Sequence, residues 1–224
     1  MIYLTGDIHG SIDISKLNTR QFTEQEYLTK NDYLIVCGDF GLVWDNSNED
    51  LYWRKWLDEK PWTTLFLDGN HENFNLLDEF PEVDMFSGKV QKISDSIYHL
   101  MRGEVYLFGG KTFLTMGGAE SHDKQCRTPG INWWAEEMPN DAEMQHALSR
   151  LMVWDNRVDY ILTHCAPREL EAEIDQYPEN QLTKFLQYLY ENVQFGQWYC
   201  GHYHQDIDLR DNFHVLFDDI LQIE

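Results

Sequence analysis

The chain contains five short apolar runs, each of the length of a buried β-strand. They cover residues 2–4, 33–37, 64–67, 160–162 and 198–200. Three longer segments carry apolar residues at helical spacing, and they predict amphipathic helices with core-facing stripes. These segments are residues 49–59, 142–153 and 182–193. Strands and helices therefore alternate near both ends of the chain.

Two further pairs of strand-like segments are separated by only two residues, which is the spacing of a β-hairpin. The pairs are residues 105–108 with 111–114 and residues 208–210 with 213–217. Gly109 and Gly110 connect the first pair, and both tolerate the positive φ of a primed turn. Asp211 and Asn212 connect the second pair. The whole pattern predicts an α/β fold of two packed mixed β-sheets flanked by helices.

No internal repeat, low-complexity tract or Pro-rich linker interrupts the 224 residues. We therefore expect one domain over residues 1–224, long enough to bury a full core. The least regular stretch is residues 117–139, which includes Gly117-Gly118, Pro129-Gly130 and Trp133-Trp134. Long irregular loops are uncommon unless they are functional, so we expect an inserted loop or cap here.

A short polar motif follows each of the five apolar runs. The motifs are G-D-I-H-G at 6–10, G-D at 38–39, G-N-H-E at 69–72, T-H-C-A-P at 163–167 and G-H-Y-H at 201–204. Ligand sites of α/β sheets lie beyond the carboxyl ends of the strands, so these motifs should converge on one crevice. Each motif alone is a weak signal, but five in this order predict a two-metal hydrolytic site.

The residue types and their spacing indicate how two ions would be held. Oxygen and imidazole ligands suit divalent metals in phosphoester hydrolysis. Asp7 and His9 are two residues apart and can reach one ion from an extended segment. Asp39, after the second strand, is the natural bridging carboxylate between two ions. The other candidate ligands are Asn70, His164, His202 and His204.

The series D-x-H, G-D, G-N-H-E, H and G-H-x-H resembles the calcineurin-like metallophosphoesterase superfamily over nearly the whole chain. The resemblance implies a four-layer α/β sandwich and a hydrolase that attacks a phosphate ester with a hydroxide bridging two metal ions. It implies that Asp7, His9, Asp39 and His204 hold one ion, and that Asp39, Asn70, His164 and His202 hold the other. The expected ions are divalent transition metals, with Mn²⁺ first and Fe, Zn or Ni as alternatives.

The resemblance also assigns the catalytic residues. His71 would not bind metal but would face the substrate and protonate or hydrogen-bond the leaving oxygen. Asp39 would hold both ions and their shared hydroxide.

The sequence departs from two branches of the superfamily, the serine/threonine protein phosphatases and the dinucleoside tetraphosphatases. Their second motif is followed by a run with an Asp and an Arg, whereas residues 40–44 here contain neither. They also carry an Arg before G-N-H, where this chain has Asp68. The expected arginine clamp is thus missing, as is the Asp that orients the catalytic histidine. Asp45 either takes that orienting role or is a solvated loop carboxylate.

Residues 117–139 offer substitutes for the missing clamp. We expect Arg127, Lys124 and His122 to bind substrate, because a guanidinium donates two parallel hydrogen bonds to a phosphate. The alternative is that the two cations form surface ion pairs. Trp133 and Trp134 either stack on a substrate ring or anchor the packing of this segment.

The formal net charge is −22, from 39 acidic and 17 basic residues. Such a charge repels polyanions, so a long nucleic acid is not an expected partner. A phosphorylated small molecule or a phosphoprotein is expected instead. No apolar stretch approaches the roughly 20 residues that span a bilayer. No export signal precedes the first apolar run, so we expect a cytoplasmic protein that does not bind membranes.

Three functions remain compatible with these features. A metal-dependent phosphomonoesterase is favoured. A phosphodiesterase acting on a nucleotide or nucleic acid uses the same site, and a non-catalytic scaffold keeps only the fold. The complete ligand set together with His71 argues against the scaffold. The physiological substrate and the oligomeric state are not predicted by the sequence.

Overall fold

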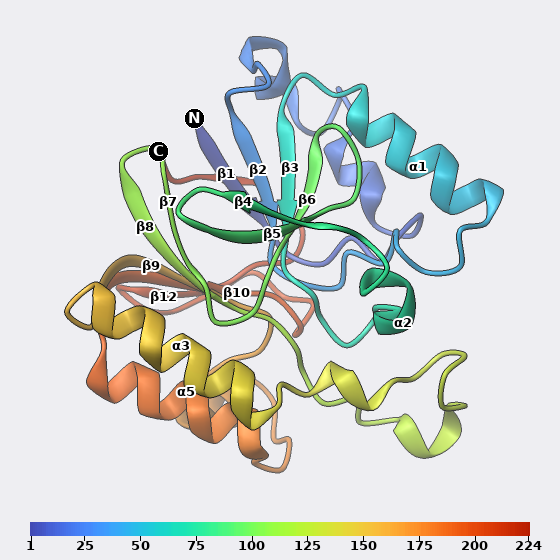
Figure 1. The fold of residues 1–224 in the computed structure, drawn as a ribbon. Helices are drawn as coiled ribbons and strands as arrows, with labels where there is room; N and C mark the ends of the chain where they lie inside the picture. The colour runs from blue at the N-terminus through green and yellow to red at the C-terminus, as the bar shows by residue number, and fades with distance from the viewer.

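The computed structural model describes residues 1–224 and contains two mixed β-sheets packed face to face (Figure 1). Sheet A runs in the order β13 (Leu221–Gln222), β1 (Ile2–Thr5), β2 (Tyr33–Val36), β3 (Thr63–Phe66), β6 (Ile97–Leu100), β5 (Gly88–Lys92) and β4 (Glu82–Met85). Sheet B runs in the order β11 (Ile207–Arg210), β12 (Phe213–Val215), β10 (Gln194–Cys200), β9 (Arg157–Thr163), β8 (Lys111–Met116) and β7 (Val105–Phe108). The central strands of both sheets are parallel and the edge strands are antiparallel.

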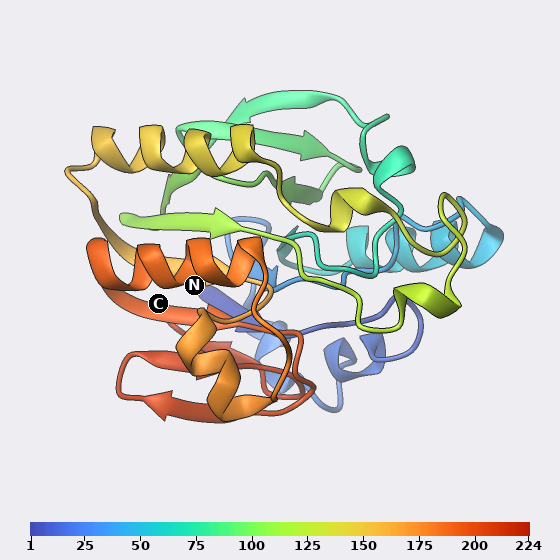
Figure 2. The same ribbon diagram turned by 90° about the horizontal axis from the view of Figure 1, so that it is seen from below.

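Helices cover the outer face of each sheet, which gives four layers. The helices are α1 (Asn48–Asp58), α2 (Phe74–Leu77), α3 (Asp141–Val153), α4 (Arg168–Ile174) and α5 (Gln181–Asn192). Short 3₁₀ helices lie at Ile14–Leu17, Thr23–Tyr27, Lys124–Cys126 and Ala135–Glu137. One apolar cluster joins sheet A to α1 and the first two 3₁₀ helices, and another joins sheet B to α3, α4 and α5. Figure 2 shows α3 and α5 side by side across sheet B. The predicted four-layer α/β sandwich is confirmed.

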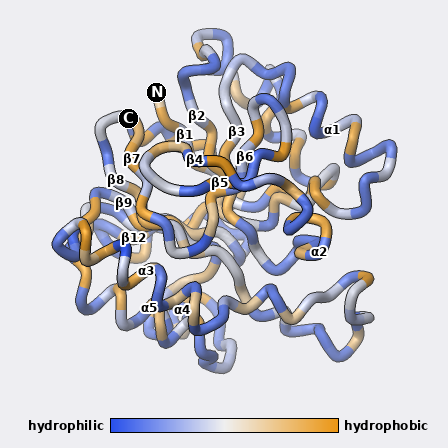
Figure 3. Tube along the Cα trace, viewed as in Figure 1, coloured by the Kyte–Doolittle hydropathy of each residue, from blue (hydrophilic) through white to orange (hydrophobic).

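A third apolar cluster fills the space between the sheets, so the central strands are buried on both faces. In β2, Leu34 and Val36 belong to the cluster under α1, while Ile35 belongs to the cluster between the sheets. This explains why the strand is apolar at successive positions instead of alternating. Figure 3 shows the same distribution, with hydrophobic positions concentrated along the strands and hydrophilic ones on the periphery.

The predicted strands, helices and hairpins all form. Gly109 and Gly110 have φ of 60° and 75°, as a primed turn requires. The β4–β5 hairpin was not predicted, because its strands carry charged residues and lie at the edge of sheet A. Edge strands commonly carry charges that prevent pairing with other chains, and these charges obscure the apolar signal.

Residues 117–139 connect β8 to α3 and form an irregular segment, which we call the cap. It contains two 3₁₀ turns and projects at the end of the molecule where α1 and α2 lie (Figures 1 and 2). No helix combines the length and the apolar composition that crossing a membrane would require.

Candidate metal centre

The five polar motifs meet at one place, as their positions after β1, β2, β3, β9 and β10 predict. The backbone at this point is unusual. Four of the candidate ligands have left-handed backbone conformations, with φ of 43° at His9, 46° at Asp39, 73° at His202 and 50° at His204. Residues other than glycine seldom adopt positive φ, and those that do are concentrated at functional sites. The turns after the strands are therefore shaped to direct these side chains inward.

Glycines in the motifs allow the strand ends to approach one another closely. A Cβ at Gly69 would collide with the carboxylate of Asp39, and one at Gly201 would collide with the carboxylate of Asp7. Only glycine fits these two positions without a shift of the backbone. The glycines before N-H-E and H-Y-H are therefore part of the site's geometry.

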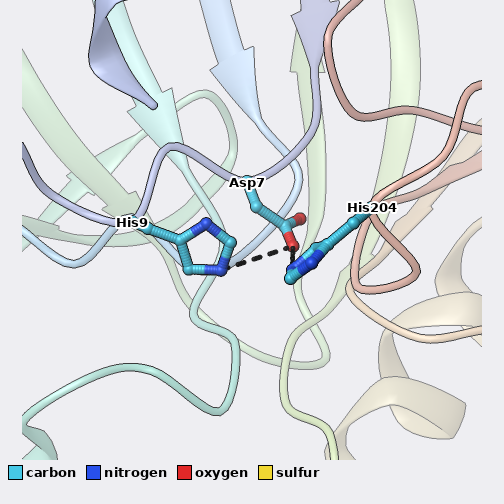
Figure 4. A group of neighbouring side chains, drawn as sticks. All are labelled: Asp7, His9 and His204. Atoms are coloured by element: carbon cyan, nitrogen blue, oxygen red, sulfur yellow. Dashed lines mark ion pairs between the residues drawn. The ribbon is translucent and has the colours of Figure 1, made fainter. Parts of the chain in front are cut away.

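The side chains expected around the first ion are close together. Nε2 of His9 lies 3.8 Å from Oδ2 of Asp7 and 3.3 Å from Oδ2 of Asp39. Nε2 of His204 lies 3.4 Å from Oδ2 of Asp7. Figure 4 shows His9 and His204 directed at Asp7 from opposite sides. Asp7, His9 and His204 each offer a donor atom within 4.8 Å of the others.

The side chains expected around the second ion form an adjoining group. Nε2 of His164 lies 3.3 Å from Oδ1 of Asp39 and 3.3 Å from Oδ1 of Asn70. The rings of His164 and His202 are 4.9 Å apart between centroids. Asp39 directs one carboxylate oxygen toward His9 and the other toward His164. It thus occupies the position between the two groups that a bridging ligand needs.

Two observations fit this donor set to divalent cations. Oδ2 of Asp7 is buried and has no hydrogen-bond partner, although a buried carboxylate oxygen normally has one. Burial acts to lower the pKa of His164, but the carboxylates of Asp39 and Asp7 outweigh it and raise that pKa to about 10. The buried carboxylates thus stabilise positive charge at this point. A divalent metal bound by oxygen and imidazole donors supplies such charge.

Neighbouring groups orient two of the imidazoles. Nδ1 of His9 lies 2.7 Å from Oδ2 of Asp13, and Nδ1 of His164 lies 3.0 Å from the carbonyl oxygen of Cys37. Donation from Nδ1 to these acceptors leaves Nε2 of each ring free to bind a metal. The sequence reasoning did not identify Asp13, although its position four residues after His9 is a usable signal.

The amide of Asn70 is oriented by the cap. Its Nδ2 donates to Oγ of Ser121 at 3.2 Å, and that hydroxyl donates to Oε2 of Glu137 at 2.6 Å. All three residues are buried. Since the amide nitrogen is held by Ser121, the amide oxygen is left facing His164. Ser121 and Glu137 lie outside the motifs, and nothing in the sequence indicated this role.

His71 lies beside the candidate metal ligands and faces the cap. Its backbone N–H donates to Oδ1 of Asp39 at 2.7 Å. The guanidinium nitrogens of Arg127 lie 3.5 Å and 3.3 Å from the two ring nitrogens of His71. Burial lowers the pKa of His71, and Arg127 lowers it further. A cation at this distance repels a second cation, which disfavours metal binding by His71.

A comparison with protein families agrees with the fold and the motifs. The family model for calcineurin-like phosphoesterases matches residues 1–206. The chain belongs to this family. Calcineurin-like phosphoesterases are metal-dependent hydrolases with a binuclear divalent-metal centre, and the clustered carboxylates and imidazoles agree with such a centre.

Similar curated proteins include three named for lariat debranching. A lariat debranching enzyme A from Xenopus laevis is 30% identical over 137 residues, which is 54% of this chain and 24% of that protein. The lariat debranching enzyme of Arabidopsis thaliana is 32% identical over 90 residues, covering 34% of this chain and 21% of the relative. The enzyme of Gallus gallus is 28% identical over 137 residues, covering 54% and 24%. The chain thus spans less than a quarter of the length of these relatives.

The structure also locates the residues at which this family member departs from the phosphatase branches. Asp68 is buried. Its Oδ2 accepts a hydrogen bond from Nε of Arg102 at 2.8 Å, and its Oδ1 lies 3.0 Å from Nε2 of His99. This arrangement is an internal ion pair, not a phosphate clamp. Asp45 is exposed and accepts a hydrogen bond from the backbone of Ser47.

The other cap residues singled out in the sequence make different kinds of contact. The ring of His122 stacks on Tyr177 and lies 6.1 Å from the ring of His202. Lys124 forms an ion pair with Glu120 at the surface. Trp134 is buried and acts as a packing anchor.

Proposed function

We propose that this calcineurin-like phosphoesterase hydrolyses phosphodiesters. The observation that carries the proposal is the charge beside His71. Among residues 122–130 of the cap, only Arg127 is not exposed. Its Nε donates to Asp123, while a second guanidinium nitrogen lies 3.3 Å from Nε2 of His71. The buried cations have partners elsewhere: Lys16 donates to the backbone carbonyls of residues 6 and 7, Arg54 to Asn46 and Lys60 to Gln25. The half-buried Arg102 is held by Asp68.

The number of cations discriminates between two kinds of substrate. A phosphomonoester carries between about −1.5 and −2 charges at neutral pH, whereas a phosphodiester carries one. The two metal ions would act on either substrate, so the difference lies in the cap, where one guanidinium matches the single charge of a diester; the chain as a whole has a net charge of −22. The diester is therefore favoured over the monoester that the sequence alone favoured.

The names of the relatives support the same substrate class. A phosphoesterase that removes a branch must cut an ester that joins two parts of a chain, which is a phosphodiester. The relatives are similar over only part of their length, so we do not transfer their substrate to this chain. Because long polyanions are repelled by the acidic surface, we propose a small diester as the substrate.

We further propose the ligand sets that the geometry allows. Asp7, His9, Asp39 and His204 would hold one ion, and Asp39, Asn70, His164 and His202 would hold the other. Mn²⁺ is the proposed metal. When bound, two divalent ions would activate water and neutralise the charge of the phosphate.

The chain's own residues would complete the reaction. Arg127 would hold a non-bridging oxygen of the phosphate, and His71 would face the leaving oxygen. The negative charge of the phosphate would raise the pKa of His71 from its lowered value. The imidazole could then give a proton to the departing alkoxide.

The proposal is tested by comparing two chromogenic esters. With Mn²⁺ supplied, kcat/KM for bis(4-nitrophenyl) phosphate should exceed that for 4-nitrophenyl phosphate by about tenfold or more, because only the diester matches the single guanidinium. A preference for the monoester would restore the phosphomonoesterase interpretation. Hydrolysis of neither ester by protein containing two metal ions would favour a non-catalytic scaffold.

Replacement of the cap arginine gives a second prediction. Arg127→Ala should lower kcat/KM for phosphodiesters by about tenfold or more, equivalent to about 1.4 kcal/mol of transition-state stabilisation, without changing metal content. Steady-state kinetics and elemental analysis would measure both. Arg168→Ala is the matched control, because Arg168 is exposed and pairs with Glu179. If Arg127→Ala has wild-type kinetics, Arg127 does not bind substrate and forms only a surface ion pair with Asp123.

A further inference from the structure

A groove leads away from the reacting centre on the side of His9 and His71. Both histidines line it, so it is continuous with the place where the phosphate would lie. Its volume is about 340 Å³. This is near the lower end of the range of about 300–1,000 Å³ for ligand pockets, and is therefore suited to one small group. We call it the residue-44 groove, after Trp44 in its wall.

Trp44 is a fixed wall of this groove. Its backbone N–H donates to Oδ2 of Asp50 at 2.9 Å, and its carbonyl oxygen accepts from Nδ2 of Asn73. Its ring and that of Trp134 of the cap form a T-shaped contact, with centroids 5.4 Å apart and an interplanar angle of 82°. The side chain is nevertheless half-buried and lines the groove. A preorganised indole costs little entropy when a flat ring stacks on it.

The charges in the groove exclude a second phosphate. Asp45, Glu49 and Asp50 line it, and no lysine or arginine does. Asp50 is satisfied by three backbone N–H groups, whereas Asp45 and Glu49 are exposed. Exposed carboxylates repel phosphate but accept hydrogen bonds from hydroxyl groups, as acidic residues do with ribose hydroxyls in dinucleotide-binding folds. The group that fits is uncharged, flat in one part and hydroxylated in another.

We infer that the residue-44 groove binds a nucleoside esterified to the scissile phosphate, with the base against Trp44 and the ribose toward Asp45 and Glu49. The inference rests on the proposed function and narrows its substrate to a nucleoside phosphodiester. Trp44 then determines specificity, while Arg127 and the metal ligands bind the phosphate itself.

Calorimetric binding to Mn²⁺-loaded protein tests this inference without requiring turnover. The probes are adenosine 5′-monophosphate, ribose 5-phosphate and inorganic phosphate. Trp44→Ala should weaken binding of adenosine 5′-monophosphate by at least about fivefold, the lower end of the loss expected for one base–aromatic stack. Binding of ribose 5-phosphate and of inorganic phosphate should stay within about twofold of wild type. Trp44→Phe, which keeps a flat ring, should recover most of the affinity.

Trp154→Ala is the matched control, since Trp154 is also half-buried but lies in a separate depression with Thr112. Unchanged phosphate binding in Trp44→Ala also shows that the metal centre is still folded. The inference is overturned if Trp44→Ala weakens all three probes equally, or if it weakens none of them. Failure of the proposed function looks different, because the wild-type protein would then bind adenosine 5′-monophosphate through Trp44 yet hydrolyse no diester.

Discussion

Asp39→Asn is expected to be the most damaging single substitution in this protein. The two carboxylate oxygens of Asp39 lie 3.3 Å from Nε2 of His9 and 3.3 Å from Nε2 of His164, one in each ligand group. Burial acts to raise the pKa of Asp39, but His164 and His9 lower it well below its usual range, so the side chain is ionised. The uncharged amide of asparagine would deprive both ions of this negative charge at once.

The measurement is metal binding together with activity. Removing a residue that hydrogen-bonds to a metal ligand costs about 10–100-fold in metal affinity. Removing a ligand that both ions share should therefore cost more than about 100-fold. We expect kcat/KM for diesters to fall by at least about 10³. Asparagine tolerates left-handed backbone conformations, so the φ of 46° at this position should be preserved.

Thermal unfolding separates loss of metal from misfolding. Wild-type protein should gain Tm when Mn²⁺ is added, because an ion that binds only the folded state stabilises it. Asp39→Asn should lose that gain. Its metal-free protein should still unfold cooperatively, but at a lower Tm, because the lowered pKa of Asp39 means that its charge stabilises the folded state. Asp95→Asn, at an exposed position, is the control and should behave as wild type. Two tightly bound ions in Asp39→Asn would rule out Asp39 as the bridge.

The sequence predicted the strands and the clustering of the motifs because both depend on local signals. A strand buried on both faces is a continuous apolar run, and the residue after it must lie at the edge of the sheet. Asp7, Asp39, Asn70, His164 and His202 could therefore be placed together before any contact was known. The prediction needed no side-chain geometry.

The groups that orient these candidate ligands could not be predicted, because their positions depend on tertiary contacts. Ser121 contacts Asn70 across 51 residues of sequence and Glu137 extends the same chain of hydrogen bonds. Trp44 was not predicted as a site residue, because in this segment only its neighbour Asp45 offered an ionisable group. Its position in the groove depends on contacts with Asn73 and Trp134. An irregular cap has no periodicity from which such contacts could be read.

His71→Gln is expected to separate a catalyst from a metal ligand. The ring of His71 lies with His9 and Asp39 in a group that could hold an ion, but Arg127 faces both its nitrogens. If the imidazole acts on the leaving oxygen, the variant should keep both metal ions and lose about 10²–10⁴ in kcat on a diester with an alkyl leaving group.

The loss in His71→Gln should depend on the leaving group. A 4-nitrophenolate ion departs without protonation, so kcat on a 4-nitrophenyl diester should fall much less than kcat on an alkyl diester. His146→Gln is the matched control, because His146 is exposed on α3 and contacts Glu104 instead of the site. Loss of one metal ion in His71→Gln would show that His71 is a metal ligand. Equal losses of kcat on both diesters would indicate that His71 binds the phosphate, because the benefit of proton donation depends on the leaving group.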